Sequence, residues 1–278
     1  MRGRIFVLLC VRSAAALALL FLTTGCLRLI DVDVPADAGE WVIEGYYNDA
    51  DSAVVRISQT VPYFGEGRPP VYADAIVTLE ELETGAVDTL RWRDSFYVRV
   101  GGRVSPQAGH IYRLRVRIGD ENIQAAVRMP RRVRIDTLLA LWRPATGALP
   151  EGYRAIAAAT DPPNEQNAYR ARVWRNDTLF NRIFDWIYSD DRYIDGRPIV
   201  FEFPYPLNVG DTFSLELMTI PVEVIRFYDQ VVRNAFGGSG GFSPPPDNAY
   251  SNFTGGKRRI WGYFFCYASD RRGIRVRE

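Results

Sequence analysis

Hydrophobic and polar residues alternate one by one in several short runs after residue 40. The clearest run is 111–118, where Tyr112, Leu114 and Val116 share one side and three arginines share the other. This period of two predicts a half-exposed antiparallel strand. Similar runs, rich in valine, isoleucine and aromatic residues and bounded by turn residues, cover 41–47, 53–58, 75–82, 96–100, 111–118 and 123–129. Such a series predicts a β-sandwich of immunoglobulin-like or transthyretin-like type over residues 40–130.

A second series of runs follows the proline and charged residues at 129–132, which we interpret as a module boundary. Its predicted strands cover 137–142, 155–160, 168–174, 179–187, 199–203, 212–219 and 260–268. One segment differs, because Val224, Tyr228 and Val231 recur at helical spacing and predict an amphipathic helix over 221–236. We therefore expect a mainly β fold of two sandwich-like modules, 40–130 and 131–278, with one principal helix in the second.

Residues 1–25 have the pattern of a secretory signal peptide. They contain no acidic residue, three arginines and an apolar run at 14–22 that is too short to span a membrane. The ending Gly25–Cys26 resembles a bacterial lipobox, so Cys26 is the predicted lipidation site and 26–39 the tether. The alternative is a conventional exported protein with a cysteine near its cleavage site.

Translation starting at Met1 places Arg12 within the apolar part of the signal, whereas a start at Val11 gives a more compact signal. Both starts stay open.

Composition supports an exported, core-stabilised protein. The chain is 47% hydrophobic and 24% charged, and removal of residues 1–25 leaves 31 basic and 33 acidic residues. This balance gives no basic excess for nucleic acid. Of three cysteines, Cys10 leaves with the signal and Cys26 is the lipid site, so Cys266 has no disulfide partner and is predicted to be a buried thiol.

Motifs for catalysis or metal binding are few. His110 is the sole histidine, which disfavours both a serine triad and a zinc site, and we expect it at a half-exposed turn. The Gly-Gly-Ser-Gly-Gly run at 237–241 has the letters of a nucleophile elbow without the required strand before it.

Asp190–Asp191 and Asp195–Gly196 form an acidic loop that could hold Ca²⁺, although a solvated turn is the preferred interpretation. Glu80, Glu81 and Glu83 are expected at a solvated strand edge. We predict no cofactor and no metal.

Two further patterns suggest binding or modification. Trp261, Tyr263, Phe265 and Tyr267 alternate along one predicted strand and could form an aromatic binding face, although burial of both faces is preferred. Four Asp-Ser/Thr-aliphatic segments suggest O-glycosylation of exported proteins; the candidate acceptors are Ser52, Thr89, Thr137 and Thr178.

Many weak motifs, taken in order, resemble one family. They are found at Cys26, 30–35, 42–45, 61–64, 75–79, 109–114, 129–130, 227–229, 242–246, 251–252, 255–256 and 262–264. Together they resemble domain of unknown function 4249, whose members are outer-membrane lipoproteins of Bacteroidota commonly encoded beside TonB-dependent transporters. The resemblance implies an outer-membrane location and transporter neighbours, and it supplies no catalytic residues. The membrane face stays open, because the acids begin only at Asp31.

We therefore expect a noncatalytic, lipid-anchored protein that is an accessory or ligand-binding partner of a TonB-dependent transporter. The alternatives are a lipid-anchored hydrolase of polysaccharide or peptide and a structural subunit of an envelope complex. The ligand, the oligomeric state and the identity of the partner are not specified by these patterns.

Overall fold

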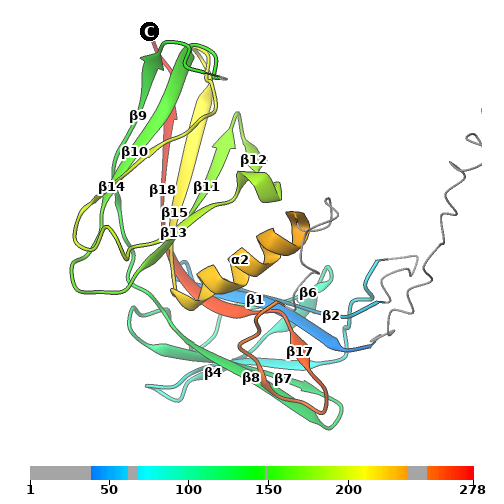
Figure 1. Ribbon diagram of the computed structural model, residues 1–278. Coiled ribbons are helices and arrows are strands. Elements are labelled where there is room, and N and C mark those ends of the chain that lie inside the picture. The colour runs from blue at the N-terminus through cyan, green and yellow to red at the C-terminus, as the bar shows by residue number, and fades with distance from the viewer. Residues whose placement is uncertain (1–38, 62–67, 148, 237–248) are drawn as a thin grey trace, which may run out of the picture. The chain divides into compact units, whose positions relative to one another are not determined.

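The computed structural model describes residues 39–61, 68–147, 149–236 and 249–278. This part is mainly β, as expected, and contains one α-helix, α2 (Glu223–Phe236), and one 3₁₀ turn, η1 (Ile183–Asp185) (Figure 1). The helices within these ranges are too short or too polar to cross a membrane. Residues 37–278 form one compact unit, and the expected signal peptide and nearly all of the expected tether lie outside the described residues.

The strands of the first half lie close to the predicted runs. They are β1 (Trp41–Asn48), β2 (Ala53–Gln59), β3 (Ile76–Glu81), β4 (Val87–Thr89), β5 (Arg91–Arg93), β6 (Phe96–Val98), β7 (Ile111–Ile118) and β8 (Glu121–Arg128). The second half adds β9 (Ile135–Arg143), β10 (Gly152–Thr160), β11 (Ala168–Arg175), β12 (Thr178–Phe180), β13 (Ile187–Asp190), β14 (Pro198–Glu202), β15 (Thr212–Ile220), β16 (Thr254–Gly255), β17 (Ile260–Trp261) and β18 (Phe264–Arg275).

Three sheets contain these strands. The ten-stranded sheet has the order β12-β11-β15-β18-β1-β2-β6-β5, with β13 beside β11 and β17 beside β1. A five-stranded sheet runs β16-β8-β7-β3-β4, and a three-stranded sheet runs β14-β10-β9. The pairs are antiparallel except those of β1 with β17 and β18, which are parallel.

The first core lies between β1, β2 and the five-stranded sheet, where the period-two residues of each strand face inward. Tyr112, Leu114 and Val116 of β7 are buried in it, as the alternation predicts. Ile43 and Val55 contribute from the ten-stranded sheet. The sandwich arrangement follows from this alternation, and the immunoglobulin-like or transthyretin-like topology stays a prediction.

Two further cores involve the second half. One lies between the three-stranded sheet and β11 and β15, and contains Ala157, Phe203 and Leu215. The other lies under α2, where Val224 and Tyr228 pack with Tyr263 and Tyr267. The helix therefore covers part of the ten-stranded sheet, in agreement with its predicted apolar stripe.

Strand β18 joins the two halves. Its first residues pair with β1, from Gly45 opposite Phe264 to Asn48 opposite Tyr267, and its later residues pair with β15. Phe264 and Cys266 consequently lie in the first core, although they come from the last residues of the chain. The predicted boundary at Pro130 stays a prediction, and the structure shows that 131–278 supplies part of the core of 40–130.

Two predicted strands differ in the structure. The run 179–187 is divided into β12, η1 and β13, because the Asp185 carboxylate accepts a hydrogen bond from the Arg182 backbone N–H at 3.0 Å and closes a tight turn. The run 260–268 is interrupted at Gly262, whose φ of +92° favours glycine. A Cβ at this position would lie 2.1 Å from the Ile43 carbonyl oxygen, so a side chain there would clash with β1.

Candidate functional site

Three carboxylates meet beside the end of β10. Asp161 follows β10, while Asp191 and Asp195 belong to the loop after β13. One potential ligand atom from each lies within 4.8 Å of the others. Asp161 and Asp191 are buried, with 0% and 5% of their surface exposed, and Asp195 is exposed. We call this group the carboxylate cluster.

Hydrogen bonds hold the carboxylate cluster in place. Asp161 accepts hydrogen bonds from the Tyr169 hydroxyl and, at 2.8 Å, from the Gly196 backbone N–H. Asp191 accepts from the Asn167 N–H at 2.6 Å, and Asp195 accepts from the Asn164 N–H at 2.8 Å. These bonds tie the segment after β10 to the loop after β13, which is a structural role.

The cluster contains more negative charge than its surroundings neutralise. Within the described ranges, none of its three carboxylates forms an ion pair with lysine or arginine. Burial raises the pKa of Asp191 above its usual value, and the nearby Asp161 and Asp195 add to this effect against the opposing hydrogen bond from Asn167. Burial and the Asp161 carboxylate likewise raise the pKa of Tyr169, so this hydroxyl remains a donor.

Carboxylate oxygens are the ligands that Ca²⁺ prefers, so these three residues could hold a divalent cation. The carboxylate cluster therefore includes only part of the acidic loop predicted from the sequence, namely Asp191 and Asp195. Asp190 instead pairs with Arg192 at 2.6 Å, and the more distant Asp161 takes its place. The solvated-turn interpretation fits Asp195 but not the buried Asp191.

Two cavities adjoin this region. One of about 350 Å³ is lined by Asn164, Glu165, Gln166, Asp190, Asp191, Arg192, Asp195 and Val222. Another of about 440 Å³ shares Glu165 and Gln166 with it and extends to the segment 128–131, where the module boundary was predicted. An ion pair of 3.1 Å between Arg131 and Glu165 crosses this second cavity's lining. Both cavities are open to solvent, and their linings present apolar as well as polar surface.

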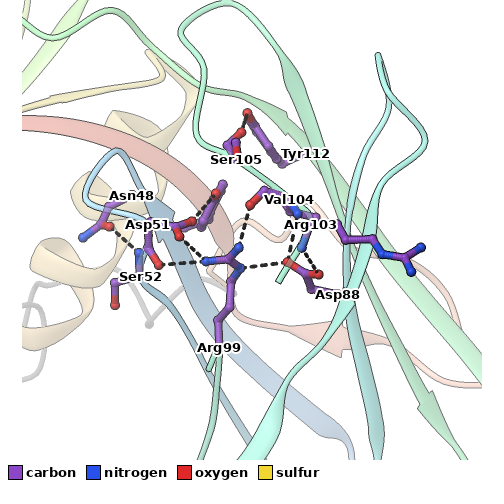
Figure 2. A network of polar contacts seen from close by, with 10 residues as sticks. Asn48, Asp51, Ser52, Asp88, Arg99, Arg103, Val104, Ser105 and Tyr112 are labelled. Atoms are coloured by element: carbon purple, nitrogen blue, oxygen red, sulfur yellow. Dashed lines mark hydrogen bonds and ion pairs between the residues drawn. The ribbon is translucent and has the colours of Figure 1, made fainter. Parts of the chain in front are cut away.

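A second polar group, shown in Figure 2, is centred on Arg99. Its Nε donates to the Asp88 carboxylate at 2.9 Å, and its Nη1 lies 2.5 Å from the Asp51 carboxylate. Nη2 donates to the Val104 carbonyl oxygen at 2.5 Å. The Arg99 and Asp88 side chains are only 2% and 6% exposed, so this is a buried ion pair. The arginine thereby links the turn after β1 to β4 and to the loop before β7.

Asp88 is held by backbone groups as well. The Arg103 and Val104 N–H groups donate to it at 2.7 and 3.1 Å. Burial by itself would raise the pKa of Asp88, but these hydrogen bonds and the Arg99 guanidinium outweigh it and lower that pKa. Gly102 permits the close approach, because a Cβ there would lie 2.0 Å from the carboxylate. All these groups are paired, so the network stabilises the loop and offers no free reactive group.

His110 is half-exposed, and two of the neighbouring glutamates, Glu80 and Glu81, lie away from any open edge of their sheet. His110 Nδ1 lies 2.7 Å from the Glu81 carboxylate, and its side chain is 28% exposed, which confirms a half-exposed residue. Glu81 is buried, and Glu80 pairs with Arg115 at 2.9 Å. The prediction of a solvated edge is wrong for these two, because β3 lies between β4 and β7.

The aromatic residues proposed as a binding face are largely covered. Tyr263 and Tyr267 are each 5% exposed and pack under α2, and Phe227 of the helix stacks on Tyr263 at 5.4 Å. Phe265 is half-buried in the same core. Trp261 lies apart from this core, since the interruption at Gly262 separates it from β18, and its indole N–H donates to Glu40. The face is thus closed by the helix.

The remaining candidates are placed as follows. Thr89, Thr137 and Thr178 are exposed and Ser52 is half-buried, so their modification stays a prediction. Cys266 is buried, and burial raises the pKa of its thiol, in agreement with an inert structural residue. Cys26 and the 237–241 run lie outside the described residues.

These observations define a mainly β protein with a shared central strand, buried polar networks and open cavities of mixed lining. Residues 28–272 match the profile of a family described as domain of unknown function, DUF4249, and the chain belongs to this family. A comparison with curated proteins finds no match.

The buried ion pair gives a pH-dependent prediction. The pKa of Asp88 is lower in the folded than in the unfolded protein, so its contribution to stability is present above the usual carboxyl pKa and is lost as pH falls through the folded value. Asp88→Asn should lower the free energy of unfolding by about 3 kcal/mol at pH 7, with the difference from the unaltered protein shrinking below about pH 4.

Urea unfolding across this pH range measures the effect, and Glu151→Gln, at an exposed carboxylate, is the control. An equal loss at pH 7 and pH 3 would contradict an electrostatic origin.

The carboxylate cluster gives a prediction of opposite sign. Because the pKa of Asp191 is raised on folding, its ionised form opposes folding above that pKa, and this penalty disappears as pH falls. Asp191→Asn keeps an oxygen that can accept from Asn167, so it should raise the free energy of unfolding by about 1 kcal/mol at pH 7 in EDTA, and by less at pH 4.

Asp190→Asn is the matched control, since this neighbour already pairs with Arg192. Destabilisation by Asp191→Asn in EDTA contradicts the prediction.

Proposed function

We propose that the protein is a noncatalytic outer-membrane lipoprotein, anchored through Cys26, that acts as an accessory or ligand-binding partner of a TonB-dependent transporter. The observation that carries the proposal is the signal-like start ending in Gly25–Cys26, directly before the family match at residues 28–272.

The described side chains support a binding role. Nucleophilic catalysis needs an activated nucleophile beside a base. Here the Cys266 thiol is buried with a raised pKa, and the imidazole of His110 is directed to Glu81. The open cavities near residues 128–131 and 164–167, with polar and apolar lining, offer contact surfaces for a partner or ligand.

The anchor predicts a defined processing defect. Cys26→Ser should accumulate as a precursor that retains residues 1–25, because the thiol to be acylated is missing. Cys10→Ser should be processed normally, since Cys10 lies within the removed segment. Electrophoresis of membrane fractions after radioactive palmitate labelling measures both, and normal processing of Cys26→Ser with retention in the outer membrane would refute the anchor.

The partnership is tested by mild detergent extraction of the full-length protein with an affinity tag after the exposed Glu278. We expect a β-barrel transporter in stoichiometric amount, which is absent from extracts of Cys26→Ser cells. Envelope machinery without a transporter indicates a structural subunit, and a monomer that cleaves glycans or peptides indicates a hydrolase. Either of these last outcomes overturns the proposal.

A further inference from the structure

A basic groove lies between the start of α2 and the turn that precedes β17. It has a volume of about 660 Å³, and its lining includes Arg226, Gln230, Tyr250, Arg258 and Arg259. The three arginines are exposed and come from two segments, the helix and the turn at 256–259. Three positive charges therefore face one opening.

Aromatic rings orient two of these arginines. The guanidinium carbon of Arg226 lies 4.9 Å from the Tyr250 ring centre, and that of Arg259 lies 4.3 Å from the Trp261 ring centre. Stacking leaves the guanidinium N–H groups at the ring edge available to an anion. In the described part of the chain, no carboxylate lies within ion-pair distance of Arg226, Arg258 or Arg259.

The acids around the groove are largely engaged elsewhere. Glu40 accepts from the Trp261 indole, and Asp120 pairs with Lys257. Glu121 accepts from the Trp41 indole at 3.2 Å and from the Lys257 backbone N–H at 2.8 Å. Glu223 is exposed one helical turn before Arg226. The guanidinium N–H groups of the three arginines can therefore donate to an anionic ligand.

The groove also lies where the chain enters the fold. A Cβ on Gly39, the first described residue, would lie 4.0 Å from Arg258 Nη1, and Trp41 pairs with Ile260. Twelve residues separate Cys26 from Gly39, so the intervening chain spans at most about 45 Å when fully extended. An acyl chain on Cys26 would keep this groove within that distance of the membrane surface.

We infer that the groove of Arg226, Arg258 and Arg259 binds the phosphate groups of anionic lipid headgroups and so orients the folded unit on the membrane. This rests on the proposed anchor, which brings the groove close to the surface. Arginine forms bidentate hydrogen bonds with phosphate oxygens, and clustered basic residues near an anionic leaflet add binding energy in proportion to their number. The lipid anchor and the groove together make two attachment points.

The test uses the non-acylated protein comprising residues 27–278, which contains the whole compact unit 37–278. Flotation with vesicles of phosphatidylglycerol and phosphatidylcholine in equal amounts should show binding that vesicles of phosphatidylcholine alone do not. Each basic side chain contributes about a fivefold factor, so Arg258→Ser/Arg259→Ser should weaken binding about 25-fold. Arg258→Lys/Arg259→Lys should retain most of it.

Arg275→Ser/Arg277→Ser is the matched control, because it removes the same charge from the last residue of β18 and from the segment that follows this twelve-residue strand. Equal loss in this control, equal binding to both kinds of vesicle, or absence of binding by the unaltered protein overturns the inference. Weakening by inorganic phosphate at millimolar concentration without any vesicle preference shows a site for free phosphate and also overturns it. Acylation plays no part in this assay, so its outcome is separate from that of Cys26→Ser.

Discussion

The structure depends on the pairing of β18 with two partners of opposite direction. Its first residues run parallel to β1, and its later residues run antiparallel to β15. One strand thereby supplies Phe264 to the first core, Tyr267 to the core under α2 and Ile274 to the core beside the three-stranded sheet. Because hydrophobic burial in all three places requires the same backbone path, the fold is fixed as a unit by this strand.

Buried acids in this unit are stabilised in two different ways. Asp88 is compensated by a buried guanidinium and by backbone N–H groups, which lowers its pKa. Asp191 has a backbone partner but also carboxylate neighbours, and its pKa is raised. A buried charge is costly unless it is paired. The ion pair of Asp88 therefore stabilises the loop that it holds, whereas Asp191 lies beside an open cavity with no cationic partner among the described residues. We therefore expect the protonation of the carboxylate cluster to respond more readily than that of Asp88 to a change of pH or to an added cation.

Much of the strand pattern was predictable, because alternation reports directly which residues face a core. The run 111–118 coincides with β7, and the helix begins two residues after its predicted start. The sequence pattern does not predict the short strands β4, β5 and β16, because a segment of three residues or fewer is too short to show an alternation of hydrophobic and polar residues. The partners Arg99 with Asp88, and Asp161 with Asp191, could not be found, because alternation specifies faces and not the residues that meet across them. The aromatic row was predicted to share a face, but its covering by α2 depends on tertiary packing.

The late position of β18 also determines when the large sheet can be completed during folding. Asn48 and Tyr267 are joined by a hydrogen bond across 219 positions of the chain, so one side of β1 has no partner until nearly the whole folded unit is available. Contacts of such sequence separation form slowly, and an unpaired strand edge invites association with other chains. A protein built in this way keeps an unpaired strand edge until its last strand is available, whereas a two-domain protein whose first module is complete in itself closes that edge earlier.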